Sequence, residues 1–219
     1  MTLINDCKDI VLVQNDVYRY VQKSDYSYKL LIVNCYDNVY DVKEIMTDYL
    51  NEPLVYNIGD DLVILYDSNF DVSDLELTDI VLSIRENLDS RIKMIKCGVI
   101  NKYNYNVLCD IYKGYKYICD RNFTFNNLSD LVVFLVDKDL DIIRNIKEKV
   151  LNKITSDNQL IKLILSMFDN DLNVTKTASS MYMHRNTINN KLDFIKKETG
   201  FNVQCFKDAM ALYIMIKNV

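Results

Sequence analysis

The sequence predicts an α+β fold in which a mixed sheet domain is followed by an all-helical domain. Between residues 28 and 126, short apolar runs alternate with segments whose apolar residues recur at helical spacing. After Asn127 only the helical spacing continues. Gly and Pro are scarce, with four and one in 219 residues, and each falls near a break in these patterns. The breaks therefore mark the boundaries of the predicted elements.

The predicted elements of the sheet domain follow the order β-α-β-β-α-β, with one more helix after them. Strands are expected over residues 30–35, 54–57, 62–66 and 92–99, and helices over residues 42–50, 77–88 and 108–115. A tight turn over residues 59–61 joins the two middle strands. This order is the split βαβ plan, in which helices back an antiparallel-centred sheet.

We expect four segments along the chain. Residues 1–27 are an N-terminal segment, ambiguous in pattern, that would pack as a helix on the sheet or on a partner. Residues 28–126 form the α+β domain, residues 127–157 a helical connector, and residues 158–219 a second, helical domain.

Composition and charge exclude several classes of protein. About half of the residues are apolar, which excludes a disordered chain. The longest apolar runs are too short to cross a bilayer, and the N-terminus lacks the basic start of a signal peptide. We therefore expect a cytoplasmic protein that makes no membrane contact.

Cysteine and histidine are too few and too scattered for a metal site. Six cysteines occur without a Cys-x-x-Cys pair, and the only histidine is His184. We expect the cysteines to be small buried residues in a reducing compartment, and we expect neither a metal nor a cofactor.

The charge is distributed unevenly along the chain. The net charge is −5, but residues 158–219 hold eight basic and five acidic residues, which gives this segment +3 and the rest −8. A mildly basic end on an acidic body is typical of a regulator in which only one face meets phosphate.

The C-terminal domain shows the pattern of three successive helices. A first apolar stripe consists of Leu160, Ile161, Ile164, Met167 and Phe168. Asn173 is placed to cap a second helix over residues 174–181, in which the small Ala178 would let a crossing helix approach. After a break at residues 182–183, His184 opens a third helix whose apolar face consists of Ile188, Leu192 and Ile195.

The exposed side of this third helix is polar over its first turns. It carries Arg185, Asn186, Asn189, Asn190 and Lys191. Arg and Asn make paired hydrogen bonds to guanine and adenine edges, so this pattern favours a helix that enters the major groove. The alternative is an ordinary helical hairpin with a solvated face, and spacing alone leaves the two about equally supported.

Residues 173–192 closely resemble the C-terminal helix-turn-helix of the PucR family, which includes sugar-diacid regulators of the CdaR type. The most distinctive string is His184-Arg185-Asn186-Thr187-Ile188. The match continues through Lys191-Leu192, the Thr199-Gly200 turn and the last helix, and is also similar to the Fis-like helix-turn-helix. The resemblance covers roughly the last 60 residues and implies a sequence-specific regulator that binds double-stranded DNA.

The resemblance also assigns roles to single residues. It implies that Asn173, Thr175 and Lys176 touch phosphates. It implies that Arg185, Thr187, Asn190 and Lys191 face the groove. Together with their neighbours, the predicted DNA-binding set is Asn173, Thr175, Lys176, His184, Arg185, Asn186, Thr187, Asn189, Asn190 and Lys191. The family usually has an aromatic residue and an arginine at positions 190 and 191, a departure that affects base preference more than binding. For His184 itself, a capping or packing role is favoured over catalysis.

The sheet domain resembles the degenerate cyclase-like (GGDEF-like) domain that many PucR-family members carry. Its hairpin, residues 56–62, has Ile58 in place of the first glycine of the cyclase hairpin, and Asp60 and Asp61 are then most simply turn residues. Where cyclases need a metal-binding aspartate the chain has Asn34-Cys35-Tyr36, and Asp37 lies beyond it. We therefore expect no enzyme activity, and a domain for sensing a small-molecule effector or for dimerisation. The alternative is a nucleotide receptor or a residual cyclase that uses this hairpin.

A homodimer is expected because one recognition helix reaches only about half a turn of DNA groove. Apolar residues for such an interface occur in two places. The last helix carries Phe206, Ala209, Met210, Tyr213, Ile214 and Ile216, and the N-terminal segment carries Ile10, Val11, Leu12 and Val13. The alternative is that both segments pack on their own subunit.

Overall fold

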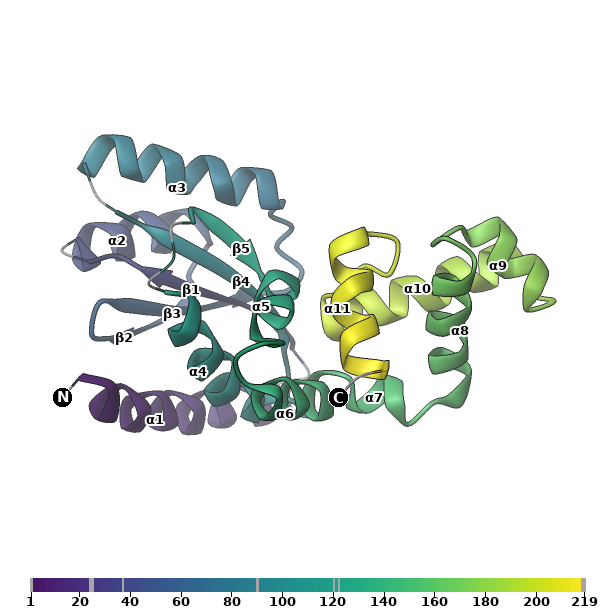
Figure 1. The fold of residues 1–219 in the computed structure, drawn as a ribbon. Helices are drawn as coiled ribbons and strands as arrows, with labels where there is room; N and C mark the ends of the chain where they lie inside the picture. The colour runs from purple at the N-terminus through teal and green to yellow at the C-terminus, as the bar shows by residue number, and fades with distance from the viewer. Residues whose placement is uncertain are drawn as a thin grey trace. The chain divides into compact units, whose positions relative to one another are not determined.

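The computed structural model describes residues 2–23, 26–36, 38–89, 91–119, 121 and 123–217, so Asp37 lies outside the described residues. The chain divides into two compact units, Met1–Leu128 and Ser129–Val219. The first unit is a sheet with helices and the second is entirely helical (Figure 1), which confirms the predicted α+β class. Residues 127–157 were predicted to form a helical connector. From residue 129 on, they instead belong to the second unit and contribute helices to it.

The sheet of the first unit has the split βαβ topology. Its strands are β1 (Tyr28–Asn34), β2 (Leu54–Ile58), β3 (Asp61–Asp67), β4 (Lys93–Ile100) and β5 (Phe125–Asn127). They lie in the order β2-β3-β1-β4-β5. The first four strands pair antiparallel, as predicted. The short strand β5, which the sequence pattern did not predict, adds a parallel pair along β4.

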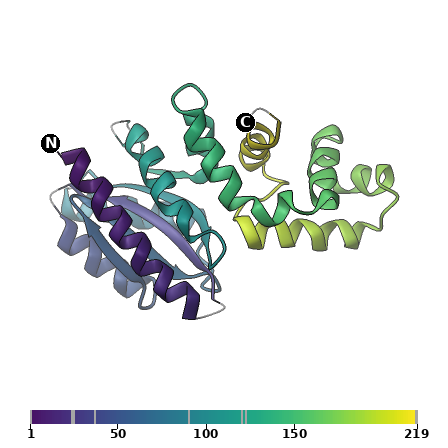
Figure 2. The ribbon, with the colours of Figure 1, turned by 90° about the horizontal axis from the view of Figure 1, so that it is seen from below.

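Helices cover both faces of this sheet (Figure 1, Figure 2). Helices α2 (Val39–Tyr49) and α3 (Asp74–Leu88) lie on one face, where Leu31, Val33, Met46 and Leu77 belong to one buried apolar cluster. Helices α1 (Thr2–Lys23) and α4 (Leu108–Ile118), with the short 3-10 helix η1 (Tyr105–Val107), lie on the other face. Strand side chains alternate between the two faces of the sheet, and helices cover both faces. Residues 30–33 of β1 are therefore all apolar and buried.

The N-terminal segment is a helix that packs on its own unit. Residues Ile10, Val13, Val17 and Val21 recur every three or four positions and are buried. The helix is tied down further by polar contacts, because Tyr56 Oη donates to Asp16 Oδ2 at 2.8 Å. The opposite side of α1 leaves Val11 and Leu12 exposed. The buried face of α1 therefore packs on its own subunit, which was one of the two alternatives for this segment.

The hairpin between β2 and β3 differs from the predicted turn at one position. Gly59 has a φ of 57° and Asp60 is exposed, as a tight turn requires. Asp61 is not a turn residue: it begins β3 and is 1% exposed. The prediction was wrong here because it considered only local turn chemistry, whereas residues of α4 surround this carboxylate.

The cysteines are less uniformly buried than predicted. Cys35 and Cys97 are buried, Cys109 and Cys119 are half-buried, and Cys205 is exposed. The side chain of Cys7 lies outside the described residues. Burial raises the pKa of the Cys35 thiol, with the charge of Asp61 adding to the effect, and burial also raises the pKa of Cys97. These two thiols therefore stay protonated at neutral pH and behave as apolar side chains.

The second unit is a bundle of helices. They are α5 (Leu128–Leu135), α6 (Leu140–Val150), α7 (Asn152–Thr155), α8 (Asn158–Asp169), α9 (Val174–Ser180), α10 (Arg185–Thr199) and α11 (Phe206–Lys217). Its core includes Ile143, Leu163, Ile195 and Leu212, all with no exposed surface. Within the described residues, no helix is both long and apolar enough to cross a membrane.

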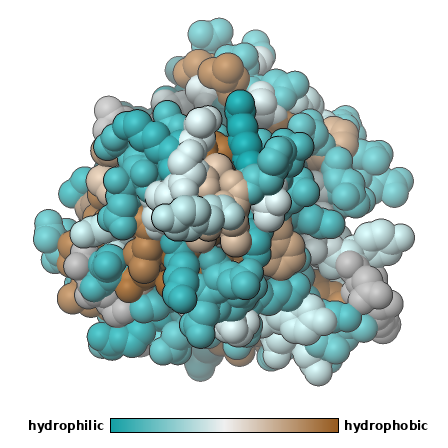
Figure 3. Space-filling view, turned by 90° about the vertical axis from the view of Figure 1, so that its right-hand side faces the viewer, coloured by the Kyte–Doolittle hydropathy of each residue, from teal (hydrophilic) through white to brown (hydrophobic). Residues whose placement is uncertain are grey.

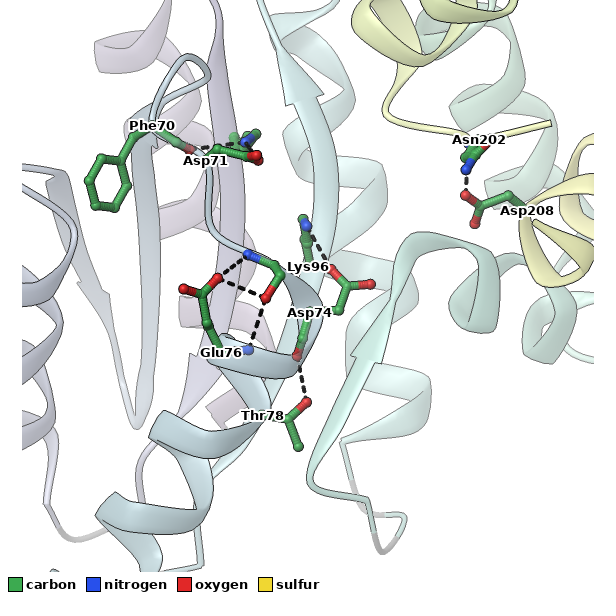
Figure 4. Close-up of polar contacts among 10 residues, drawn as sticks. Phe70, Asp71, Asp74, Glu76, Thr78, Lys96, Asn202 and Asp208 are labelled. Carbon is green, nitrogen blue, oxygen red and sulfur yellow. Dashed lines mark hydrogen bonds and ion pairs between the residues drawn. The ribbon is translucent and has the colours of Figure 1, made fainter. Parts of the chain in front are cut away.

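Side-chain contacts join the first and last helices of this unit. Asp208 of α11 accepts hydrogen bonds from Ser129 Oγ and from the backbone amide of Asn202, the latter at 2.8 Å (Figure 4). Lys207 forms an ion pair with Asp130 at 2.9 Å. These contacts fix the start of α11, which packs against α6 and α8.

Candidate nucleic-acid interface

Helices α8 and α9 are held together by a small polar network as well as by apolar packing. Ser166 Oγ on α8 lies 3.1 Å from Ser180 Oγ on α9. Asn170, which ends α8, donates from Nδ2 to the Ser166 carbonyl oxygen at 2.7 Å and to Ser180 Oγ at 3.1 Å. The network joins the last turn of α8 to the last residue of α9, so it holds the two helices together.

The start of α9 is capped as the sequence predicts. Asn173 Oδ1 accepts hydrogen bonds from the backbone amides of Thr175 at 3.0 Å and Lys176 at 3.1 Å. Both Thr175 and Lys176 are exposed, while Thr177 and Ala178 point into the unit and are buried. The ammonium of Lys176 forms an exposed ion pair with Asp171 at 3.1 Å, a partner that the sequence pattern did not indicate.

The turn between α9 and α10 has the geometry of a Schellman motif. The amide of Met183 donates to the Ala178 carbonyl oxygen at 2.9 Å, and the amide of Tyr182 donates to the Ser179 carbonyl oxygen at 3.3 Å. Tyr182 adopts a φ of 54° at the position where glycine is usual. For a residue with a Cβ this left-handed conformation costs about 1–2 kcal/mol. Sequence reasoning placed a break at this position but did not single out Tyr182.

Helix α10 begins at its own side-chain cap. His184 is the N-cap residue, and its Nδ1 accepts from the backbone amide of Asn186 at 3.2 Å. This confirms the predicted capping role. The helix ends at Gly200, whose φ of 84° is the left-handed conformation that glycine adopts without a steric cost.

The packing of α10 determines which of its residues are exposed. Ile188, Leu192 and Ile195 are buried, as predicted, and they fix one face of the helix against α8 and α9. The opposite face is therefore held outwards. Figure 3 shows the face turned toward the right of Figure 1, where α8 and α9 lie, and this face is mostly hydrophilic with scattered hydrophobic side chains.

The structure leaves most of the predicted site residues exposed, at the start of α9 and over the first turns of α10. Exposed are Asn173, Thr175, Lys176, His184, Arg185, Asn186, Thr187 and Asn190. Asn189 and Lys191 are half-buried, and Lys191 Nζ donates to Gln159 Oε1 of α8 at 3.2 Å. These two side chains are thus less available than the sequence pattern suggested.

A second polar cluster lies in the sheet unit around Asp61. Its carboxylate accepts from Tyr112 Oη at 2.8 Å, from Tyr115 Oη at 3.0 Å and from Asn34 Nδ2 at 2.8 Å. The ammonium of Lys116 lies 2.6 Å from Asp61 Oδ2. Burial raises the pKa of Tyr115, and the charge of Asp61 raises it further. The Tyr115 hydroxyl therefore stays protonated and donates to a carboxylate that Lys116 neutralises.

Metal-ligating side chains do not cluster in the part of the chain that the structure describes. No group of three or more His, Cys, Asp or Glu residues lies close enough together there to hold an ion. The hairpin side chain Ile58 is buried, at 1% exposure, on the edge strand β2.

The short helix α9, a tight turn and the polar exposed start of α10 together form a helix-turn-helix, a motif found in many DNA-binding proteins. The family model of the PucR C-terminal helix-turn-helix domain matches residues 160–217, which confirms the resemblance predicted from the sequence. Geometry and family together support a DNA-binding transcriptional regulator.

Two further comparisons concern the whole chain. No curated protein sequence matches it. Among solved structures, it is similar to the regulator of polyketide synthase expression from Bifidobacterium adolescentis, at 12% identity and a TM-score of 0.43. That similarity covers 88% of this chain and 80% of the other.

Proposed function

We propose that the protein is a sequence-specific regulator of transcription that binds double-stranded DNA and places α10 in the major groove. The observation that carries this proposal is the exposed polar start of α10, held outwards by the buried face of Ile188, Leu192 and Ile195. Arg185 is suited to guanine and Asn186 or Asn190 to adenine, because these side chains make paired hydrogen bonds to base edges. The protein would act in the cytoplasm.

The start of α9 supplies the phosphate contacts of this proposal. Thr175 and Lys176 are exposed beside the capped first turn, where a hydroxyl and an ammonium reach an anion. The positive charge of residues 158–219 favours association with DNA, although the whole chain is acidic.

We also propose that two copies bind together. A single recognition helix covers one half-site, and a second copy supplies the other about 34 Å away. The surface that favours this is on α11, where Phe206, Met210 and Tyr213 follow one another at spacings of four and three and are 73%, 36% and 46% exposed. They form one apolar stripe along α11 that its own unit covers only in part, since the ring of Tyr213 packs edge-on against Phe168 of α8. Light scattering of the full chain at micromolar concentration tests this proposal, and a monomer with and without DNA would contradict it.

The sheet unit is proposed to be a degenerate cyclase-like domain without catalysis, used for sensing a small-molecule effector or for dimerisation. The strand order supports the likeness to a cyclase domain. The ion pair between Asp61 and Lys116 supports the absence of catalysis, because a catalytic hairpin would need a free carboxylate where Asp61 is paired. Purified protein with GTP and magnesium should release no cyclic dinucleotide. Turnover that disappears in Asp60→Ala would support the alternative, a residual cyclase, instead.

The main experiment selects duplexes from a genomic fragment pool with the full chain and measures their affinity by fluorescence anisotropy at several salt concentrations. Arg185→Ala should lose about 1–3 kcal/mol on the selected duplex and much less on random duplexes. Lys176→Ala should weaken both alike. Arg144→Ala removes an arginine of α6 that pairs with Asp141, and serves as the control that should bind as the wild type does. Failure of the wild type to bind any fragment at low salt would overturn the proposal.

A further inference from the structure

Tyr182 is unusual in its backbone conformation and in the exposure of its side chain. Its backbone is in the left-handed conformation at the Schellman position between α9 and α10, where glycine or asparagine is the usual residue. Its side chain is 97% exposed, the highest value among the exposed large apolar and aromatic side chains of the described residues. The ring therefore makes almost no contact with its own chain that would offset the backbone strain.

The position of Tyr182 suggests what the ring contacts instead. It lies in the tight turn, two residues before the His184 cap and three before Arg185. Residues of such a turn lie at the rim of the groove when the following helix enters it. A tyrosine hydroxyl is among the groups that donate to backbone phosphates, and these contacts set the register of a protein on the duplex.

We propose that Tyr182 is a positioning residue of the DNA complex, in which its hydroxyl donates a hydrogen bond to a phosphate of the duplex. This inference rests on the proposed function and adds to it a neutral contact at the turn, outside both the basic start of α9 and the polar face of α10. A strained and exposed aromatic side chain is unfavourable in the free protein. It gains a partner only in the complex, which is consistent with strain located at a functional site.

The test compares three variants of the full chain on the duplex selected for the wild type. Tyr182→Asn keeps a residue that tolerates the left-handed conformation and removes the ring. Tyr182→Phe keeps the ring and removes only the hydroxyl. Tyr40→Asn, which changes a tyrosine of α2 that is 79% exposed, is the matched control.

Tyr182→Asn and Tyr182→Phe should each bind about tenfold more weakly than the wild type, and Tyr40→Asn should bind equally well. Tyr182→Asn should unfold at the same temperature or a higher one, so the loss does not reflect misfolding. Because Tyr182 is neutral, the slope of affinity against salt should not change, whereas Lys176→Ala should lower it by about one.

Each other outcome has a distinct meaning. If the wild type binds DNA and Tyr182→Asn binds as well, the inference is wrong and the proposed function stands. If Tyr182→Phe binds as the wild type while Tyr182→Asn does not, the hydroxyl-to-phosphate assignment is overturned in favour of ring packing. If Tyr182→Asn changes only the sedimentation coefficient, the ring is a protein contact and the inference is again wrong. If the wild type binds no duplex, the proposed function fails and this inference fails with it.

Discussion

The ammonium of Lys116 on α4 lies 2.6 Å from the carboxylate of Asp61 at the start of β3. Asp61 is 1% exposed, so this contact neutralises a charge that water barely reaches. The hydroxyls of Tyr112 and Tyr115 and the side-chain amide of Asn34 also donate hydrogen bonds to this carboxylate. The cluster thereby connects α4 to the hairpin edge of the sheet.

Removing one partner of this pair should destabilise the sheet unit strongly. Lys116→Met leaves a buried carboxylate without its countercharge, and we expect a loss of about 3 kcal/mol in the free energy of unfolding. The double variant Asp61→Asn with Lys116→Met should recover most of that loss, because no buried charge remains. Urea denaturation of the three proteins measures both effects. Equal stability of the single and double variants would show that the charge itself is unimportant.

A buried hydroxyl in α9 offers a stabilising substitution. Thr177 has no exposed surface, and its Oγ1 has no hydrogen-bond partner. Thr177→Val keeps the shape of the side chain and removes the unsatisfied group, so it should raise the free energy of unfolding by about 1 kcal/mol. Thermal unfolding measures the change, with Thr175→Val, at an exposed position of the same helix, as the control. A lower melting temperature for Thr177→Val would contradict the prediction.

The ion pair between Asp171 and Lys176 should restrain DNA binding. Asp171 competes with phosphate for the lysine ammonium, and it has a φ of 57°, which asparagine also tolerates. Asp171→Asn should therefore bind duplexes of any sequence several-fold more tightly at low salt, with little change in stability because the pair is exposed. Asp141→Asn, which frees Arg144 on α6, is the matched control. Unchanged affinity for Asp171→Asn would indicate that Lys176 does not meet phosphate.

The capping box of α3 should make the sheet unit sensitive to acid. Glu76 accepts from the backbone amide and hydroxyl of Ser73, both at 2.7 Å (Figure 4), and these hydrogen bonds lower the pKa of Glu76 below its ordinary value of 4.5. A lowered folded-state pKa contributes stability that is fully present above the unfolded-state value and is lost as the pH falls through the folded-state value. The difference in unfolding free energy between the wild type and Glu76→Ala should therefore shrink below about pH 4.5. A difference that stays constant from pH 7 to pH 3 would refute this account.

Local signals allowed much of the helix-turn-helix to be predicted. The Asn173 and His184 caps and the buried face of Ile188, Leu192 and Ile195 depend on neighbours within one or two helical turns, so their spacing reveals them. The four main strands were predicted for the same reason. The roles of the exposed residues stay predictions.

The features that sequence reasoning missed depend on distant partners or on conformation. Strand β5 has only three residues and is defined by its pairing with Met94–Lys96, so no periodicity marks it. Asp61 resembled a turn residue until α4, more than 50 positions later, supplied its partners. The exposure of Tyr182 and the ion pair of Asp171 follow from a left-handed backbone that residue type alone did not suggest.

The division of α10 into a buried face and an outward face has an evolutionary consequence. Ile188, Leu192 and Ile195 carry the packing energy of the helix, while Arg185, Asn186 and Asn190 contribute little to it because they are exposed. Substitutions at exposed positions usually change stability by less than about 0.5 kcal/mol. Under the proposed function, exchanges on the outward face would change operator preference without compensating changes in the core, so duplicated copies of such a gene would acquire new targets one residue at a time.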